Sequence, residues 1–171
     1  VSHTGALAGD QRAWDALCAQ TPCLMVDTVD AFIGTLLALQ NLELRPGRPT
    51  REVVLFGNGG GTGVLATDSL SELGLRVEPF AGEARAALEA LKLPPGTSVA
   101  NPVDAPVATL QGEQGLIAGR ILDLIYAHTR PDAIVMHLNL ASFVGRGDND
   151  PLANLIRVAE QTRHAHPGRA H

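Results

Sequence analysis

The 171-residue sequence predicts an α/β protein built on a doubly wound parallel sheet. From residue 52 onward, short apolar segments alternate with amphipathic segments, which is the pattern of strands joined by right-handed helical crossovers. A glycine-rich stretch directly follows the first of these strands. Apolar residues make up 45% of the chain and charged residues 18%, so a buried core can form under a charged surface.

The first forty residues are predicted to form two helices with a short strand between them. Asp10 is placed to cap a helix that runs to about Ala19, and Trp14 lies on the apolar side of that helix. Residues 23–26 form an apolar run of strand type. Residues 29–40 have the apolar spacing of a second amphipathic helix.

A linker and a strand–glycine–helix unit follow. Residues 43–51 contain two prolines and no periodicity, which is typical of a linker. Residues 52–56 predict the first strand of the sheet, and residues 57–63 form the glycine-rich stretch. A helix is expected over residues 64–73, and Gly74 suits the left-handed conformation that ends many helices.

The rest of the chain continues the alternation of strands and helices. Further strands are expected at residues 76–79, 97–100 and 133–138, and further helices at residues 83–91 and 114–127 and from Pro151, capped by Asp150, to about Arg163. Numbered from residue 52, the strands are expected in the order 2-1-3-4 of a flavodoxin-like, Rossmann-like sheet, with a fifth strand missing after His171. We interpret the chain as a fragment.

Composition argues against several classes of protein. A net charge of -5 and only 4% aromatic residues disfavour nucleic-acid binding. The apolar runs are too short to span a bilayer, and no secretory signal is visible, so we expect a cytoplasmic protein. Cys18 and Cys23 match neither zinc nor redox spacing. His164, His166 and His171 lack acidic or thiol partners nearby, so no metal site is predicted.

Three polar segments are expected at the carboxyl ends of the strands, where parallel sheets bind ligands. They comprise residues 58–63, 101–104 and 137–139. Glycines before a helix allow backbone amides to converge on an anion. Because no lysine follows the glycines, this is not a P-loop. A tight turn without a ligand remains an alternative, as does a dinucleotide site using Gly61, Gly63 and Glu78.

Two histidines are candidates for chemistry. His3 lies among small residues, and its neutral imidazole could act as a nucleophile towards phosphorus. An exposed histidine without a function is the alternative. His137, within an apolar strand, is interpreted as a core or strand-end residue, and a position facing the ligand edge is the alternative.

Three ordered motifs resemble the nucleoside-diphosphate-forming acyl-CoA synthetases, a family related to succinyl-CoA ligase. Residues 2–9 (SHTGALAG) resemble the phosphohistidine segment, residues 58–68 (NGGGTGVLATD) the glycine loop and its helix, and residues 101–104 (NPVD) a third signature. Thr62 departs from the family, which more often has proline there. Together the match covers nearly the whole chain.

The resemblance implies a mechanism and a set of site residues. Phosphate attacks an acyl-CoA to give an acyl phosphate, whose phosphoryl group passes to a histidine and then to ADP. By resemblance, His3 is the phosphoryl carrier. The implied phosphate-binding residues are Gly59, Gly60, Gly61, Thr62 and Gly63, and the implied supporting residues are Asn58, Asn101 and Asp104.

The resemblance also implies cofactors, partners and domains. CoA and ATP or ADP with Mg²⁺ are expected to bind mainly to a CoA-binding domain and an ATP-grasp domain or subunit, so this chain alone should be inactive. Residues 1–42 would belong to the phosphohistidine subdomain and residues 52–171 to a truncated ligase domain. We expect a homo- or hetero-oligomer. A non-catalytic regulatory or assembly module of the same fold is the alternative, and the sequence leaves the acyl group and the choice between ADP and GDP open.

Overall fold

Two units divide the chain, Val1–Leu44 and Arg45–His171. The computed structural model describes residues 10–41, 47, 49–143 and 151–167. Within that part of the chain, no helix is long and apolar enough to cross a membrane.

The described part of the first unit contains two helices. The α1 helix (Gln11–Gln20) begins after Asp10, whose carboxylate accepts a hydrogen bond from the backbone N–H of Arg12, so the predicted cap is confirmed. The side chain and backbone N–H of Arg12 lower the pKa of Asp10 from its ordinary value. The α2 helix (Val29–Asn41) is also confirmed. The strand predicted at residues 23–26 is wrong, since this segment has no regular structure.

A three-stranded parallel sheet forms the centre of the second unit. The β1 strand (Val53–Gly57) lies between β2 (Val103–Asp104) and β3 (Ala133–His137). The predicted α/β class is therefore confirmed. The predicted strand order is wrong in detail, because β3 pairs directly with β1 along all five residues instead of lying beyond another strand.

The strands predicted at residues 76–79 and 97–100 do not form, and the hydrogen bonds of the chain explain why. Arg76 makes only an isolated bridge to Glu52, whereas Ser98 pairs antiparallel with Asp104. Asn101 precedes a cis peptide bond to Pro102, and its side chain is buried. This side chain makes hydrogen bonds to β1 that the backbone of a neighbouring strand would otherwise make. Its Oδ1 accepts from the backbone N–H of Leu55 at 2.9 Å, and its Nδ2 donates to the backbone oxygens of Val53 and Glu78.

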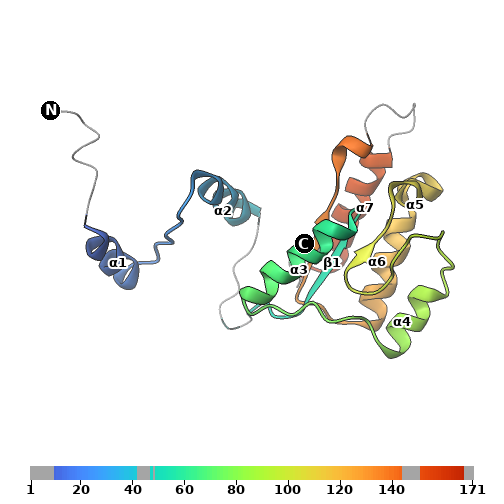
Figure 1. The fold of residues 1–171 in the computed structure, drawn as a ribbon, viewed down its shortest axis with the longest axis horizontal. Coiled ribbons are helices and arrows are strands. Elements are labelled where there is room, and N and C mark those ends of the chain that lie inside the picture. The colour runs from blue at the N-terminus through green and yellow to red at the C-terminus, as the bar shows by residue number, and fades with distance from the viewer. Residues whose placement is uncertain (1–9, 42–46, 48, 144–150, 168–171) are drawn as a thin grey trace. The chain divides into compact units, whose positions relative to one another are not determined.

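The core divides between the two faces of the sheet, because successive residues of β1 point to opposite sides. Val54 and Phe56 pack in a large cluster with residues of α4 (Gly82–Glu89), α6 (Ile117–His128) and α7 (Pro151–Ala165). Val53 and Leu55 pack on the other side against residues of α3 (Gly60–Glu72) and the segment that follows it. Helices thus cover both faces of the sheet (Figure 1).

The predicted helices of the second unit are present, with one important shift. The α3 helix starts at Gly60, four residues before the expected position. Gly74 has the expected left-handed conformation, with φ of +77°. Pro151 begins α7 as expected, but its predicted cap, Asp150, lies outside the described residues. Short helical turns add α5 (Val107–Leu110) and two 3₁₀ segments, Gly112–Gly115 and Leu140–Ser142.

Candidate functional site

The carboxyl end of β1 brings residues from three strands into one row. Gly57 is in register with Asp104 of β2 on one side and with His137 of β3 on the other. The turn into α3 begins at the next residue. This end of the sheet therefore collects the polar segments that follow the strands, as the parallel topology requires.

The early start of α3 places the glycines in the first turn of a helix rather than in a loop. The amide of Gly59 donates to Asp104 Oδ1 at 2.9 Å, and that of Gly63 donates to the Gly59 carbonyl oxygen at 3.0 Å. The amides of Gly60, Gly61 and Thr62 belong to the first turn, where no intrahelical acceptor exists. All three of these residues are exposed.

Asn58 links the glycine turn to the segment after β3. Its backbone N–H donates to the His137 carbonyl oxygen at 3.3 Å, and its Oδ1 accepts from the Asn139 backbone N–H at 2.7 Å. The Asn58 Nδ2 atom is buried and has no hydrogen-bond partner among the described residues. Because a buried donor without an acceptor costs about 1–3 kcal/mol, an additional acceptor here would be stabilising.

The nine residues implied by the resemblance are therefore not all in one place. Asn58, Asp104 and the glycine turn lie together at the carboxyl edge. Asn101 instead lies beside β1, where its carboxamide bonds the backbone of Val53 and Leu55. His3 lies outside the described residues.

His137 is a residue of this edge that sequence reasoning did not assign to the site. It is exposed at the end of β3. A Cβ built on Gly59 would be 3.7 Å from His137 Cε1 and 3.6 Å from Thr62 Oγ1, so the imidazole and the hydroxyl both lie beside the start of α3. The sequence signal was its position at the end of a strand. Only the pairing of β3 with β1 revealed which turn it faces.

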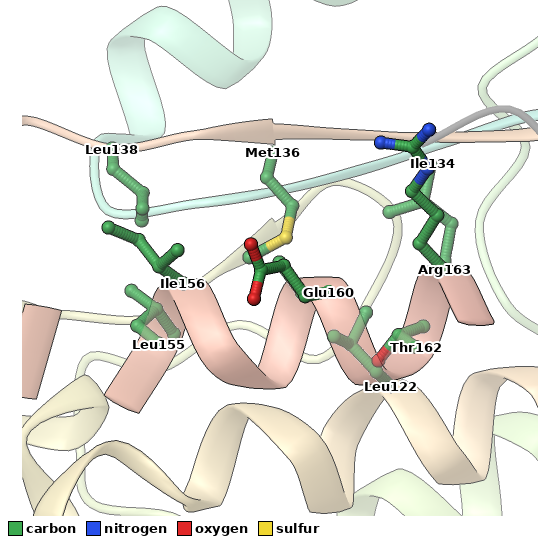
Figure 2. A pocket seen from close by; sticks show the side chains of 10 residues that line it. Leu122, Ile134, Met136, Leu138, Leu155, Ile156, Glu160, Thr162 and Arg163 are labelled. Atoms are coloured by element: carbon green, nitrogen blue, oxygen red, sulfur yellow. The ribbon is translucent and has the colours of Figure 1, made fainter. Parts of the chain in front are cut away.

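A separate groove lies between β3 and α7 and has a volume of about 310 Å³. Figure 2 shows Met136 of β3 and Leu138, which follows this strand, facing Leu155 and Ile156 of α7 across it. Its lining is mainly apolar, and none of the predicted site residues contributes to it. No group of three histidine, cysteine or acidic side chains in the described ranges is arranged to hold a metal ion.

The Gly60→Ala substitution tests how the glycine turn is held. A Cβ at Gly60 would lie 2.8 Å from Asp104 Oδ2. We expect the carboxylate to rotate away and weaken its bond to the Gly59 amide, which lowers the free energy of unfolding by about 1 kcal/mol. Gly61→Ala is the matched control, because nothing lies within 4 Å of its new methyl group. Urea denaturation and exchange of the Gly59 amide measure both effects, and equal behaviour of the two variants would contradict the expectation.

No family model matches the chain. Among curated proteins, the alpha subunit of acetate–CoA ligase [ADP-forming] II from Pyrococcus furiosus is 27% identical over 167 residues, which cover 98% of this chain and 35% of the relative. The alpha subunit of acetate–CoA ligase [ADP-forming] I from the same organism is 38% identical over 104 residues, covering 61% of this chain and 21% of the relative.

Solved structures agree on the fold. A crystal structure of a Pyrococcus horikoshii OT3 protein matches 96% of this chain and 41% of its own, with a TM-score of 0.63 and 22% identity. The dinucleotide-forming acetyl-coenzyme A synthetase 1 of Ca. Korarchaeum cryptofilum, in complex with phosphate and ADP, matches 94% of this chain and 38% of its own, with a TM-score of 0.50 and 20% identity. The chain spans about a third of the length of the acetate–CoA ligase II alpha subunit. The resemblance to the nucleoside-diphosphate-forming acyl-CoA synthetase family, predicted from three ordered motifs, is confirmed.

Proposed function

We propose that this chain is the phosphoryl-carrying part of an acyl-CoA ligase that forms a nucleoside diphosphate. The whole enzyme would interconvert acyl-CoA, phosphate and ADP with acid, CoA and ATP. The observation that carries the proposal is the first turn of α3, where the amides of the exposed residues Gly60, Gly61 and Thr62 have no intrahelical acceptor. The relatives named above, which are ADP-forming ligases, favour phosphoryl transfer as the use of these amides.

In the proposed chemistry, one phosphoryl group is transferred twice, first to His3 and then to ADP. A nitrogen of the His3 imidazole attacks the phosphorus of an acyl phosphate, the bond from phosphorus to the acyl oxygen breaks, and the carboxylate leaves. An oxygen of the ADP β-phosphate then attacks the phosphohistidine, the P–N bond breaks, and the imidazole is restored. The first-turn amides and the dipole of α3 would hold the anionic phosphoryl group while His3 carries it.

The supporting residues have distinct proposed roles. The Asp104 carboxylate orients the turn through the Gly59 amide, which leaves the next three amides for the phosphoryl oxygens. Asn58 fixes the turn against the segment after β3. Asn101 acts at a distance, by holding β1, whose end carries the turn.

The proposal also specifies partners. CoA and ATP or ADP with Mg²⁺ would bind mainly to other domains or to a second subunit, as expected for a chain similar to alpha subunits of two ligases. The triphosphate site belongs to that partner in this scheme. The described residues of this chain supply the anion-binding turn.

Labelling with γ-³²P ATP tests the proposal in the whole protein that carries this chain, with its nucleotide-binding partner present. We expect acid-labile, base-stable label in the native protein and none in His3→Ala, because alanine has no nitrogen to phosphorylate. His164→Ala, which alters an exposed histidine near the end of α7, is the matched control and should be labelled normally.

Three results would overturn the proposal. Labelling of His3→Ala at the native level would exclude His3 as the carrier. Normal acyl-CoA synthesis by the same variant would favour a non-catalytic module instead. Micromolar binding of NAD or NADP would favour the dinucleotide alternative.

A further inference from the structure

We infer that His137 is a binding residue for the oxyanion held at the first turn of α3. The inference rests on the proposed function, because it assigns an additional ligand-binding residue to the same anion site.

Backbone contacts fix the position of His137 relative to the glycine turn. Gly57 pairs with it across β1 and β3, and the Asn58 backbone N–H donates to its carbonyl oxygen at 3.3 Å. The Asn58 side chain also accepts from Asn139, two residues further along. The backbone at residues 137 and 139 is therefore held against the glycine turn.

The imidazole lies where a ligand of the first-turn amides could contact it. His137 Cε1 and Thr62 Oγ1 are 3.7 Å and 3.6 Å from the same point, the Cβ position that Gly59 leaves open. Glycine at that position keeps a side chain out of the space between the ring and the hydroxyl. An imidazole, a hydroxyl and the backbone donors together offer the hydrogen bonds that a tetrahedral oxyanion accepts.

The unpartnered Nδ2 of Asn58 is a second and independent sign of a missing acceptor at this turn. The atom is buried, although its own residue already makes two hydrogen bonds to the segment around His137. The Asn58 Nδ2 donor and the exposed imidazole thus both lie at the paired carboxyl ends of β1 and β3, beside the start of α3.

The charges at this turn make each hydrogen-bond donor important. Asp104, which bonds Gly59 from the β2 side, is an acidic residue at this turn, and the first turn of α3 contains no acidic or basic residue. An oxyanion beside this carboxylate is repelled, so its binding depends on the donors that surround it.

Sulfate is the appropriate probe, because it is a tetrahedral oxyanion of constant charge near neutral pH, where phosphate titrates. The titration uses the 171-residue chain with His3→Ala, which removes the other candidate imidazole. Amide NMR signals of Gly60, Gly61 and Thr62 report binding. We expect a further His137→Ala substitution to weaken sulfate binding about tenfold, the effect of losing one hydrogen bond to a charged ligand.

His137→Gln keeps a hydrogen-bond donor, so its sulfate affinity should fall less than that of His137→Ala. The matched control is His128→Ala, which alters the histidine at the end of α6, 3.9 Å from Glu83, and should keep the native sulfate affinity. Native sulfate affinity in His137→Ala would overturn the role of His137 and leave the anion site intact. Absence of any sulfate response at the Gly60 and Gly61 amides would overturn the anion site itself, and this inference with it.

Discussion

Asn101→Ala should lower the free energy of unfolding of the second unit by about 2–5 kcal/mol. The carboxamide is buried, with an exposed fraction of 5%, and bonds three backbone groups: the N–H of Leu55 and the carbonyl oxygens of Val53 and Glu78. Alanine leaves all three without partners, and each unsatisfied buried group costs about 1–3 kcal/mol, with incomplete additivity. Urea denaturation followed by circular dichroism measures the loss.

Amide exchange shows whether the loss arises where the structure predicts. The Leu55 amide should exchange faster in Asn101→Ala, because its acceptor is the deleted Oδ1. Gln161→Ala, at an exposed position of α7, is the control and should change stability by less than about 0.5 kcal/mol. A loss below that value in Asn101→Ala would show that the backbone finds other partners, and that this side chain does not replace a strand.

The second large effect is expected for Gly57→Ala at the end of the central strand. A Cβ at this position would lie 2.4 Å from the His137 carbonyl oxygen and 3.3 Å from its carbonyl carbon. Because these atoms belong to the backbone of the paired strand, β1 and β3 must separate to admit the methyl group. Overpacking of this kind costs about 1–3 kcal/mol and more where backbone must move, so we expect a loss of at least about 3 kcal/mol.

Gly119→Ala provides the comparison for Gly57→Ala. Its new Cβ would meet Val158 at 3.5 Å, an ordinary contact, within α6. Stability should stay unchanged or rise by up to about 1 kcal/mol, because alanine favours the helix over glycine. If the two variants unfolded at the same urea concentration, the close approach of β1 and β3 at Gly57 would be refuted.

Local sequence signals predicted those parts of the fold that depend on neighbouring residues. The cap at Asp10, the helix end at Gly74 and the start of α7 at Pro151 were all correct, since each follows from the backbone preferences of one residue. The strands at residues 53–57 and 133–137 were also found, within a residue at each end, because each is a short apolar run bounded by turn residues.

Pairing between distant segments was not predictable from the same signals. The segments at residues 76–79 and 97–100 were predicted as strands but make only single bridges. The structure places the predicted site residues in two locations. The glycine turn, Asn58 and Asp104 meet at one edge, whereas Asn101 bonds the backbone of β1.

The sequence by itself determined the α/β class, most helices and the chemical character of the edge, because periodicity and turn residues are local properties of the chain. Only the tertiary structure decided that β3 lies beside β1, that α3 begins within the glycines, and that His137 faces the turn. Those outcomes depend on which backbone groups find partners across 45 to 80 residues of chain, as the bonds of Gly59 to Asp104 and Glu52 to Asp132 illustrate. Such partners are selected by the free energy of the whole packed unit, which no local pattern contains.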